Sequence, residues 1–265
     1  MAHKNKKGSN LNLAIGFIGL VIFIVIISFI FKVFWVVKES QFDGTNKFNL
    51  QITDSRGTGV ISFSPKEKSI SILKIEENMQ GSLAKNLKVP IDGYLNLKNK
   101  NFNYSNISSS LFINIFSLPS THINLTYFDI IRLSLFTRTV SPNFIYERKL
   151  VKEYSDLQKS TILSLTFKDP AIVAESMSIE VVNGTEVSGL GTNLANLVTN
   201  MGGNVVLVGS KDLQKESKII YFKKNSYTAK KLSNYLNFPL EETGSRGLAD
   251  VIIIIGEDSL DRLKF

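Results

Sequence analysis

The sequence contains no cysteine among its 265 residues, which excludes disulfide bonds, thiolate metal sites and a cysteine nucleophile. Histidine is almost absent as well, and His122 is the only one beyond the first ten residues. No serine, base and acid arrangement accompanies His122, so a structural role is expected for it. The glycine patterns of dinucleotide-binding and P-loop proteins are also missing. Without disulfides, an exported domain must be stabilised by its hydrophobic core, which the 43% hydrophobic composition allows.

Charge is missing from residues 11–31, and only Asn12 and Ser28 are polar in that run. As a helix, this run would be about 30 Å long, which matches the hydrocarbon core of a bilayer. A soluble helix needs one apolar stripe, whereas this segment is apolar on all sides. The sequence therefore predicts one transmembrane anchor over residues 11–37. A cleaved signal peptide is the alternative, but the run exceeds the usual apolar core of about 7–15 residues and no small-x-small cleavage site follows it.

Basic residues at the N-terminal end predict the orientation of this anchor. Lys4, Lys6 and Lys7 precede the apolar run, and no acid occurs before Glu39. The positive-inside rule then makes residues 1–10 a cytoplasmic head and exports the rest of the chain. We expect a single-pass protein of the cytoplasmic membrane with its domains on the extracytoplasmic face. The short head has no room for a DNA-reading element, so transcriptional regulation and nucleic-acid partners are not expected.

The exported part is mildly basic, because four of the 31 Lys and Arg residues precede residue 38 and all 23 acids follow it. This balance suits anionic polymers or lipid headgroups. The exported part divides into three sections. Residues 38–49 have the composition of a polar stalk, residues 50–170 form a first domain, and residues 177–258 form a second.

The first domain gives mixed signals. Residues 59–75 predict a β-hairpin with a tight turn at its Pro-Lys-Glu-Lys sequence. Apolar residues at helical spacing predict a helix over residues 126–136, with Thr126 at its start. Residues 160–167 are predicted as a β-rich tract, and residues 100–125 fit either a loop or a strand pair. Together these signals predict a small α+β domain.

The second domain has the clearest pattern. Strands are predicted for SIEVVNG, NVVLVG, KIIYF and DVIIIIGED. The segment SGLGTNLANLVTNMGG predicts an amphipathic helix, and SYTAKKLSNYLNF a second one with Ser226 as its N-cap. The apolar face expected for the first helix consists of Leu190, Leu194, Leu197 and Val198. The order βαββαβ predicts an α/β domain with helices packed on a central sheet.

The string SIEVVNGTEVSGLGTNLANLVTNMGGNVVLVG resembles the LytR C-terminal domain family. Such domains open with an apolar strand and an Asn-Gly-Thr turn, continue with a Gly-Leu helix start, and reach a glycine before the second strand. Residues 181–185, 188–191 and 202–208 correspond to these features, and the closing strand at residues 249–258 also matches. The resemblance covers about residues 178–258 and implies a role in the bacterial cell envelope.

The first domain looks like a shortened LytR-CpsA-Psr domain, which commonly lies between a membrane anchor and this C-terminal domain. GVISFSPKEKSISILKI is similar to its strand, Pro-Lys turn and strand, and VPIDGYLNLKN to a later helix end and strand. Active members transfer a glycopolymer from a polyprenyl-pyrophosphate carrier to peptidoglycan, with arginines for the phosphates and carboxylates for the metal. Here Gly57 stands where the family has Asp, and Glu76 and Glu77 replace a Pro-Arg-Asp motif. The resemblance therefore implies a degenerate, non-catalytic version.

Five residues at the start of the second domain are ligand-binding candidates, namely Asn183, Gly184, Thr185, Gly189 and Thr192. An Asn-Gly turn that leads into a helix start offers backbone N–H groups to an anion or a sugar hydroxyl. The alternative is a tight turn in which glycine supplies a positive φ angle, and turn geometry alone explains the residue choice.

Three arginines are candidates for phosphate contacts, namely Arg56, Arg132 and Arg138. The plainer alternative is a solvated turn for Arg56 and a helix surface for the other two. Glu76 and Glu77 are the candidates for a metal, yet a lone acidic pair is usually solvated. We therefore expect no metal site and no catalytic residue.

Two functions stay open. In the first, the anchor confines a binding or scaffold domain near nascent wall polymer and raises its effective concentration. In the second, the chain is a polyprenyl-pyrophosphate-dependent glycopolymer transferase with a rearranged site, and only this function would need Mg²⁺ or Mn²⁺. The broken motifs favour the first, for which no cofactor is expected. The expected partners are the lipid bilayer and peptidoglycan or an anionic wall polymer.

Overall fold

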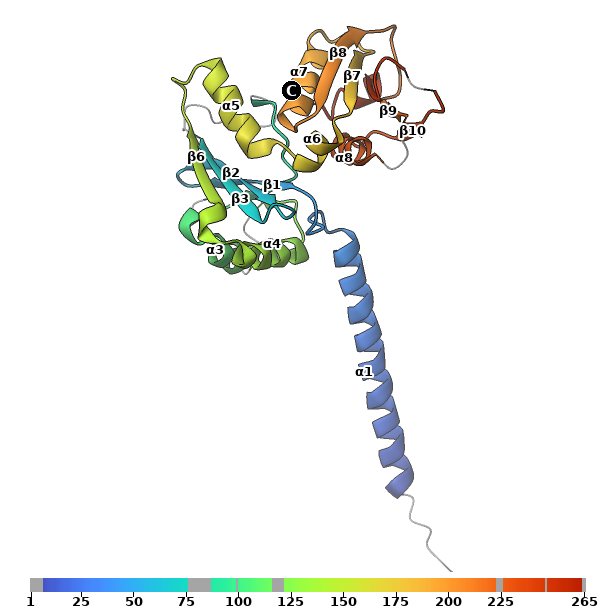
Figure 1. Ribbon diagram of the computed structural model, residues 1–265. Helices are drawn as coiled ribbons and strands as arrows, with labels where there is room; N and C mark the ends of the chain where they lie inside the picture. Colours follow the sequence, from blue (N-terminus) through green and yellow to red (C-terminus); the bar gives the residue numbers. More distant parts are fainter. Residues whose placement is uncertain are drawn as a thin grey trace, which may run out of the picture.

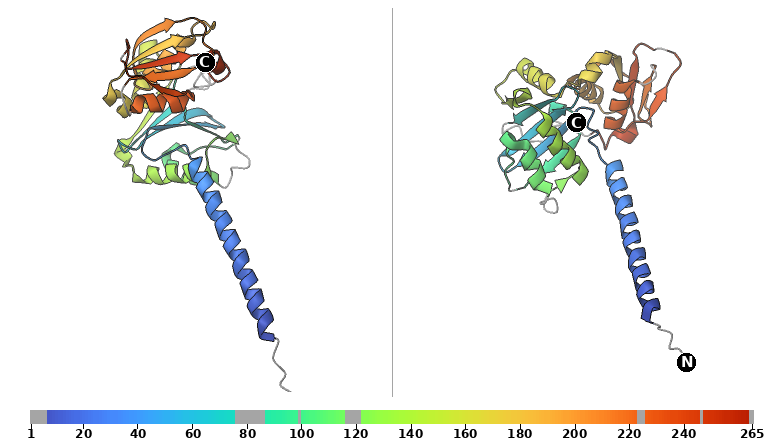
Figure 2. Two further views of the ribbon diagram at one scale, coloured as in Figure 1. Left: turned by 90° about the vertical axis from the view of Figure 1, so that its right-hand side faces the viewer. Right: turned by 60° about the horizontal axis from the view of Figure 1, so that its bottom comes forward.

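The computed structural model describes residues 7–75, 87–98, 100–115, 122–222, 226–245 and 247–263. A long N-terminal helix leads into a middle domain, and the C-terminal domain lies beyond the middle domain as seen from this helix (Figures 1 and 2). Each domain is built on its own sheet. The mixed α/β architecture with an N-terminal apolar helix is therefore confirmed.

Helix α1 spans Lys7–Lys38. Its segment Ala14–Lys38 is long and apolar enough to cross a membrane, and none of its most apolar window is buried inside the protein. A helix whose apolar span is exposed on all sides is suited to a lipid surrounding. Trp35 lies near its C-terminal end, where the ammonium of Lys38 is 5.6 Å from the centre of the Trp35 ring.

The segment after α1 differs from the polar stalk predicted at residues 38–49. Phe42 is only 1% exposed, and its ring packs against those of Phe48 and Phe136. The backbone N–H of Phe42 donates to the carboxylate of Asp129 at 2.9 Å. Burying one aromatic side chain removes a large apolar area from water, and this folds an otherwise polar segment onto the middle domain.

The middle domain contains a mixed sheet with the strand order β5-β4-β1-β2-β3-β6. Its strands are β1 (Phe48–Asp54), β2 (Gly57–Ser64), β3 (Ser69–Ile75), β4 (Gly93–Asn96), β5 (His122–Ile123) and β6 (Ile145–Leu150). Strands β1, β2 and β3 are antiparallel neighbours, whereas β4 runs parallel to β1 and β6 parallel to β3. The predicted hairpin is confirmed as β2 and β3, and Lys68 in its turn has a positive φ of 47°.

Helices cover both faces of this sheet (Figure 1). Helices α3 (Ile107–Ile115) and α4 (Tyr127–Thr139) pack on one face, and α5 (Asp156–Phe167) packs on the other. The start of α4 is confirmed where the sequence predicts it. The Thr126 hydroxyl accepts from the N–H of Asp129, and the Asp129 carboxylate accepts from the N–H of Thr126.

The prediction of a β-rich tract at residues 160–167 is wrong, because these residues lie in α5. Ser155 caps the N-terminus of this helix, and Leu163 and Phe167 are buried four residues apart on one face. The run of Thr, Ile and Leu in the segment has high β-propensity and masks the helical period.

Residues 100–125, which the sequence leaves open, contain mainly helix in their described part. The 3₁₀ helix η2 (Tyr104–Asn106) leads directly into α3, and β5 adds two residues to the edge of the sheet. A second 3₁₀ helix, η4 (Pro142–Phe144), connects α4 to β6.

The C-terminal domain has a second sheet with the strand order β10-β9-β11-β7-β8. Its elements are β7 (Ser178–Asn183), β8 (Asn204–Ser210), β9 (Lys218–Tyr221), β10 (Leu240–Glu242), β11 (Val251–Ile255) and the 3₁₀ helix η5 (Glu257–Ser259). Strand β11 is central, parallel to β7 and antiparallel to β9. The short edge strand β10 is an addition to the predicted βαββαβ order, since its three residues are too few to show a period.

Helices α7 (Leu190–Asn200) and α8 (Tyr227–Leu236) pack on one face of this sheet, and α6 (Pro170–Glu175) precedes β7. The four residues expected on the apolar face of α7 all belong to the core. Gly202 has a φ of 99° and ends α7, and Ser226 caps α8 by accepting from the N–H of Ala229. Both termini are as the sequence predicts.

Candidate functional site

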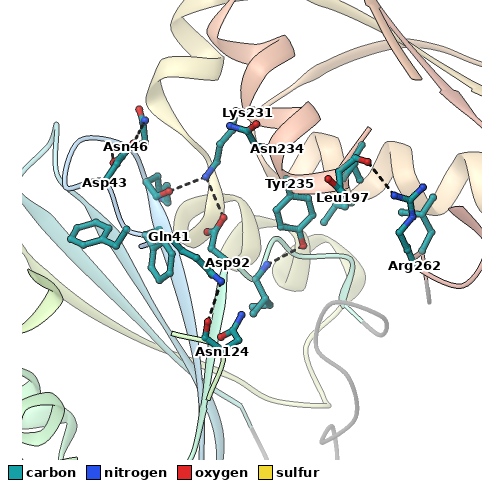
Figure 3. Close-up of a pocket in the computed structure, with 17 residues that line it drawn as sticks. Gln41, Asp43, Asn46, Asp92, Asn124, Leu197, Lys231, Asn234, Tyr235 and Arg262 are labelled. Atoms are coloured by element: carbon teal, nitrogen blue, oxygen red, sulfur yellow. Dashed lines mark hydrogen bonds and ion pairs between the residues drawn. The ribbon is translucent and has the colours of Figure 1, made fainter. Parts of the chain in front are cut away.

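The two domains meet where helix α8 lies against the segment before β4 (Figure 3). The hydroxyl of Tyr235 accepts a hydrogen bond from the backbone N–H of Ile91 at 3.1 Å. The ammonium of Lys231 lies 3.2 Å from the carboxylate of Asp92 and 3.1 Å from the carbonyl oxygen of Lys47. These contacts join parts of the chain that are far apart in sequence, so they fix the C-terminal domain against the middle domain.

A cavity of about 690 Å³ lies between the domains beside these contacts. Its wall is rich in polar side chains, namely the amides Gln41, Asn46, Asn124, Asn234 and Asn237, the cations Lys47, Lys231 and Arg262, and the acids Asp43 and Asp92. Figure 3 shows these groups coming from the segment after α1, from residues that flank β4 and β5, from α8 and from the chain after η5. The volume is within the range of small-molecule sites, about 300–1,000 Å³. Since amides both donate and accept hydrogen bonds, the wall suits a ligand rich in hydroxyl groups.

Lys47 is the most deeply buried cation of this cavity wall. Its ammonium donates to the carbonyl oxygen of Lys168 at 2.8 Å. Burial lowers the pKa of Lys47 to about 8, and the negative charges of Glu67, Asp169 and Asp92 offset this only in part. At neutral pH the group is still mostly charged, so it places a positive charge inside the cavity.

The lowered pKa of Lys47 predicts that stability rises with pH. Between about pH 8 and 10.5, the unfolded chain binds a proton on Lys47 that the folded chain has released. Raising the pH through this window therefore favours the folded state. Relative to Lys47→Met, we expect the free energy of unfolding to rise by about 1–3 kcal/mol between pH 8 and 10. Denaturant unfolding of both full chains in one detergent measures this, and equal pH slopes would contradict it.

Both carboxylates of the cavity bind protein groups. Asp92 accepts from the backbone N–H of Asn49 at 2.8 Å and from its side-chain amide at 3.1 Å. Asp43 accepts from the N–H groups of Thr45 and Asn46 at 2.7 and 2.8 Å. Burial alone would raise the pKa of Asp43, but these hydrogen bonds lower it overall. The acids thus organise the wall. The cations and several amides are also bound within the protein, so a ligand would meet the remaining N–H groups and oxygens of these side chains.

Tyr235 adds a neutral donor to the same wall. Burial raises the pKa of its hydroxyl to about 12, so the group stays protonated at neutral pH. The oxygen already accepts from Ile91, and the hydroxyl keeps a proton that it can donate.

The five predicted ligand-binding residues lie elsewhere, between β7 and the first turns of α7. The side-chain carbonyl of Asn183 accepts from the N–H and the hydroxyl of Thr185 at 3.1 and 2.8 Å. The amide of Asn183 donates to the carbonyl oxygen of Val187 at 3.0 Å. The N–H of Gly184 donates to the carbonyl oxygen of Ile255 at 2.9 Å. The groups expected to receive an anion are therefore used to close the turn.

Gly184 is required by close packing and not by a positive φ angle, which corrects the reason inferred from the sequence. A Cβ at this position would lie 2.4 Å from the side chain of Gln214 and 2.9 Å from the carbonyl oxygen of Ile255. Gly189 does have a positive φ, 78°, and is the N-cap of α7. Thr192 lies exposed on α7, and none of the five residues lines the interdomain cavity.

Arg56 is the first of the three arginines predicted to contact phosphate. It pairs with the carboxylate of Asp54 at 3.1 Å and donates to the carbonyl oxygen of Phe102. It also lines a second, smaller cavity of about 270 Å³, together with Lys74 and Tyr104. Arg56 is thus bound within the protein but remains accessible from this cavity.

Arg132 and Arg138 bind other parts of the chain. Arg132 donates to the carbonyl oxygens of Phe42 and Asp43 at 2.9 and 3.2 Å. Arg138 donates to the hydroxyl of Ser108 at 2.9 Å. In the described part of the chain, the three arginines therefore do not share a cavity.

Among the described residues, no group of three His, Asp or Glu side chains could bind a metal ion. Glu76 and Glu77, the acidic pair considered for a metal, lie outside the described residues, as do Lys4 and Lys6 of the expected cytoplasmic head. The backbone of His122 belongs to β5, and its side chain is outside the described part.

Sequence reasoning missed the interdomain cavity. One part of its wall, residues 41–48, has the composition of a stalk, and the other parts are separated by long stretches of chain. One signal could have pointed to it. Lys231, Asn234 and Tyr235 are spaced i, i+3 and i+4, so they share one side of the predicted helix. Three hydrogen-bonding side chains on one side of a helix can form part of a binding site.

Comparison with known proteins identifies the C-terminal region. Residues 176–258 match a family model described as LytR cell envelope-related transcriptional attenuator, LytR_C. The C-terminal domain matches the LytR_C family. The match covers the whole second sheet, from β7 to β11, and the two helices that pack on it. The predicted resemblance of this part of the chain is confirmed, and a LytR_C domain indicates a role connected with the cell envelope.

Two crystal structures of Listeria proteins also show some likeness to the chain. Lmo1026 of Listeria monocytogenes is 10% identical, with a TM-score of 0.30 over 46% of this chain and 86% of that chain. Lin1025 of Listeria innocua is also 10% identical, with a TM-score of 0.19 over 83% of this chain and 96% of that chain. TM-scores this low do not establish a shared fold. No curated protein matches the sequence.

Proposed function

We propose that this chain is a membrane-anchored, extracytoplasmic binding protein of the bacterial cell envelope, and that its ligand occupies the interdomain cavity. The position of the cavity carries the proposal. Residues 41–48 contribute to its wall and directly follow α1, the helix that is long and apolar enough to cross a membrane. The LytR_C domain forms the opposite wall through α8 and supports a role in the envelope. A ligand in this cavity would be bound close to the membrane surface.

The proposed topology is a single crossing of the cytoplasmic membrane, with the N-terminus inside and both domains outside. Lysines at positions 4, 6 and 7 precede the apolar run, and no acid occurs before Glu39. This bias supports a cytoplasmic N-terminus. Both domains then face the compartment in which wall polymers are assembled.

The proposed ligand is a segment of peptidoglycan or of an anionic wall polymer. Five side-chain amides and the hydroxyl of Tyr235 can hydrogen-bond to sugar hydroxyls. Lys231 pairs with Asp92 and Arg262 with Asp258, while the buried ammonium of Lys47 donates to a carbonyl oxygen. The charge of Lys47 therefore favours phosphate or carboxylate groups on the polymer. In this role the anchor raises the local concentration of the binding site near growing polymer, and no cofactor is needed.

Binding to isolated cell-wall sacculi tests this proposal. Asn234 is exposed on α8 and lines the cavity, so Asn234→Asp adds one negative charge there with almost no change of volume. We expect this substitution to weaken binding to sacculi that retain their anionic polymers about five- to tenfold, because the added carboxylate repels the phosphate or carboxylate groups of the polymer. Co-sedimentation of the full chain in detergent gives the bound fraction.

The matched control is Asn204→Asp, which adds the same charge at the exposed start of β8. It should bind as the unchanged chain does. Sacculi stripped of anionic polymers separate the two ligand classes, since binding that survives stripping points to peptidoglycan itself. Equal binding of Asn234→Asp and Asn204→Asp would show that the polymer does not bind in the interdomain cavity.

The alternative function, glycopolymer transfer from a polyprenyl-pyrophosphate carrier, is favoured by the smaller cavity. Arg56 and Lys74 line it together with the hydroxyl of Tyr104, so it could receive a phosphate group. However, the nearby carboxylate of Asp54 already accepts from the N–H and the guanidinium of Arg56 and from the N–H of Phe102. Magnesium- or manganese-dependent turnover of a lipid-linked glycan by the full chain, lost in Arg56→Ala, would establish this alternative.

A further inference from the structure

The outer face of helices α3 and α4 is apolar and exposed. On α4, the side chains of Tyr127, Ile131 and Leu135 follow one another at intervals of four residues. On α3, Phe112 and Ile113 are exposed beside them. These five side chains, the α3–α4 patch, are between 38% and 64% exposed. An interval of four residues places side chains on one side of a helix, so the α4 residues form a continuous apolar stripe.

The α3–α4 patch is not part of the domain core. The opposite sides of the two helices bury Ile107, Leu111, Ile130 and Leu133 against the middle sheet. Each helix is therefore apolar on both its inner and its outer side. The inner side is accounted for by the core, whereas exposed apolar surface that is gathered in one patch usually marks an interaction site.

The end of α1 is fixed directly to α4. The hydroxyl of Ser40 donates to the carboxylate of Asp129 at 2.6 Å, and the N–H of Phe42 donates to the same carboxylate at 2.9 Å. From the next turn of α4, Arg132 donates to the carbonyl oxygen of Phe42 at 2.9 Å. The α4 helix therefore begins at the point where α1 ends.

The orientation of α3 and α4 follows from this attachment. Figure 1 shows α4 lying across the direction of α1, and Figure 1 and the left view of Figure 2 place it at the level of the C-terminal end of α1. The middle sheet and the C-terminal domain lie on the side away from α1, so the outer face of α3 and α4 is on the side toward which α1 extends. A membrane crossed by α1 would therefore lie against this face.

The charges around the α3–α4 patch suit an anionic surface. Between residues 101 and 140, the sequence has a single acid, Asp129. That acid is fully buried and accepts hydrogen bonds from Ser40 and Phe42. Arg138 is exposed on the last turn of α4, and Arg132 is partly exposed on its second turn. Within residues 101–140, anionic headgroups would thus meet positive charge and no exposed acid in the described part. The nearest exposed acids in the adjoining segment are Glu39 and Asp43, which flank the attachment of α1 to α4.

We propose that the α3–α4 patch lies in the headgroup layer of the bilayer that α1 crosses, so that the middle domain docks on the membrane surface. Amphipathic helices that lie in this layer place aromatic and aliphatic side chains at the boundary of the acyl chains and basic groups among the headgroups. Tyr127 and Phe112 supply the aromatic groups, and Ile113, Ile131 and Leu135 the aliphatic ones. The inference rests on the proposed function in one respect, namely that α1 crosses the membrane.

The absence of native cysteine allows a direct test on the full chain. Ile131→Cys and Leu135→Cys, each carrying a nitroxide spin label, are reconstituted into vesicles of phosphatidylcholine and phosphatidylglycerol. Collision rates with oxygen, which enters the acyl region, and with a water-soluble nickel complex report the depth of each label. Two references are Val25→Cys in the middle of α1 and Leu213→Cys, which is exposed in the C-terminal domain.

We expect the labels at positions 131 and 135 to favour oxygen over nickel severalfold compared with the label at position 213. If the label at position 25 lies in the acyl region while those at 131 and 135 behave like that at 213, α1 crosses the membrane but the patch does not dock on it. If the label at position 25 is also accessible to nickel, α1 does not cross the membrane, and both the proposed anchor and the docking are refuted. Shielding of position 131 from both reagents, with spin–spin broadening that disappears on dilution with unlabelled chain, would show a second copy on the patch and overturn the inference.

Discussion

Replacing Phe42 with alanine is expected to lower the free energy of unfolding of the middle domain by about 3–5 kcal/mol. The Phe42 ring contacts those of Phe48, Phe63 and Phe136, with centroid distances of 5.5, 6.4 and 6.2 Å. Alanine would leave a cavity among three rings that belong to a strand pair and to α4, and these elements can collapse only in part. Denaturant unfolding of the full chain in detergent, followed by circular dichroism, measures the loss.

The control for Phe42→Ala is Phe144→Ala. Phe144 is in η4 and half of its surface is exposed, so its removal should cost less than about 1 kcal/mol. Equal small losses for both variants would mean that the segment after α1 is a flexible stalk, as its composition suggests. A large loss of unfolding free energy for Phe42→Ala alone would show that this segment is an integral part of the middle domain.

Replacing Asp129 with alanine is expected to cost about 3 kcal/mol or more, because one buried carboxylate satisfies groups on two elements. One oxygen accepts from the hydroxyl of Ser40 and the N–H of Phe42, at 2.6 and 2.9 Å. The other accepts from the N–H and the hydroxyl of Thr126, at 2.8 and 2.7 Å. Alanine would leave these donors without their partner in the domain interior, and unpaired buried polar groups carry the full cost of desolvation.

Asp156→Ala is the matched control for Asp129→Ala, since Asp156 is also in the first turn of a helix but is exposed. Its removal should cost well under 1 kcal/mol, the scale of a surface charge at a helix N-terminus. The same unfolding measurement applies to both variants. Similar losses would show that Asp129 acts only through the N-terminus of α4, without joining α4 to the segment after α1.

The elements that the sequence predicts correctly combine a clear period with a local start or stop. Thr126 starts α4, Gly202 ends α7 and Ser226 starts α8, and each interaction involves residues only a few positions apart. The errors arise where one of these signals is missing. Helix α5 has a cap, but its β-branched residues favour a strand, and Phe42 is a single aromatic residue in a polar segment that shows no period.

The interdomain cavity could not be predicted from the sequence, because its residues become neighbours only when the two domains pack together. Asp92, Asn124 and Lys231 each have the sequence context of a solvated surface residue, and no local pattern connects them. The Asn-Gly turn at position 183 was conspicuous in the sequence for a structural reason, since its polar groups close the loop before α7. A local sequence pattern thus identified a turn, whereas the cavity depends on contacts between distant segments that no local pattern shows.

The connection between α1 and the middle domain is short and contains no flexible linker. Only Glu39 separates the end of α1 at Lys38 from Ser40, and the N–H groups of Glu39 and Ser40 still donate to carbonyl oxygens of the last turns of α1. Ser40 is in turn bound to Asp129, so the domain cannot swivel freely on its helix. Membrane-spanning helices adjust to bilayers of different thickness by tilting. With the proposed anchoring and docking, this connection couples the tilt of α1 to the position of the α3–α4 patch, so the thickness of the membrane would set how deeply the patch enters the headgroup layer.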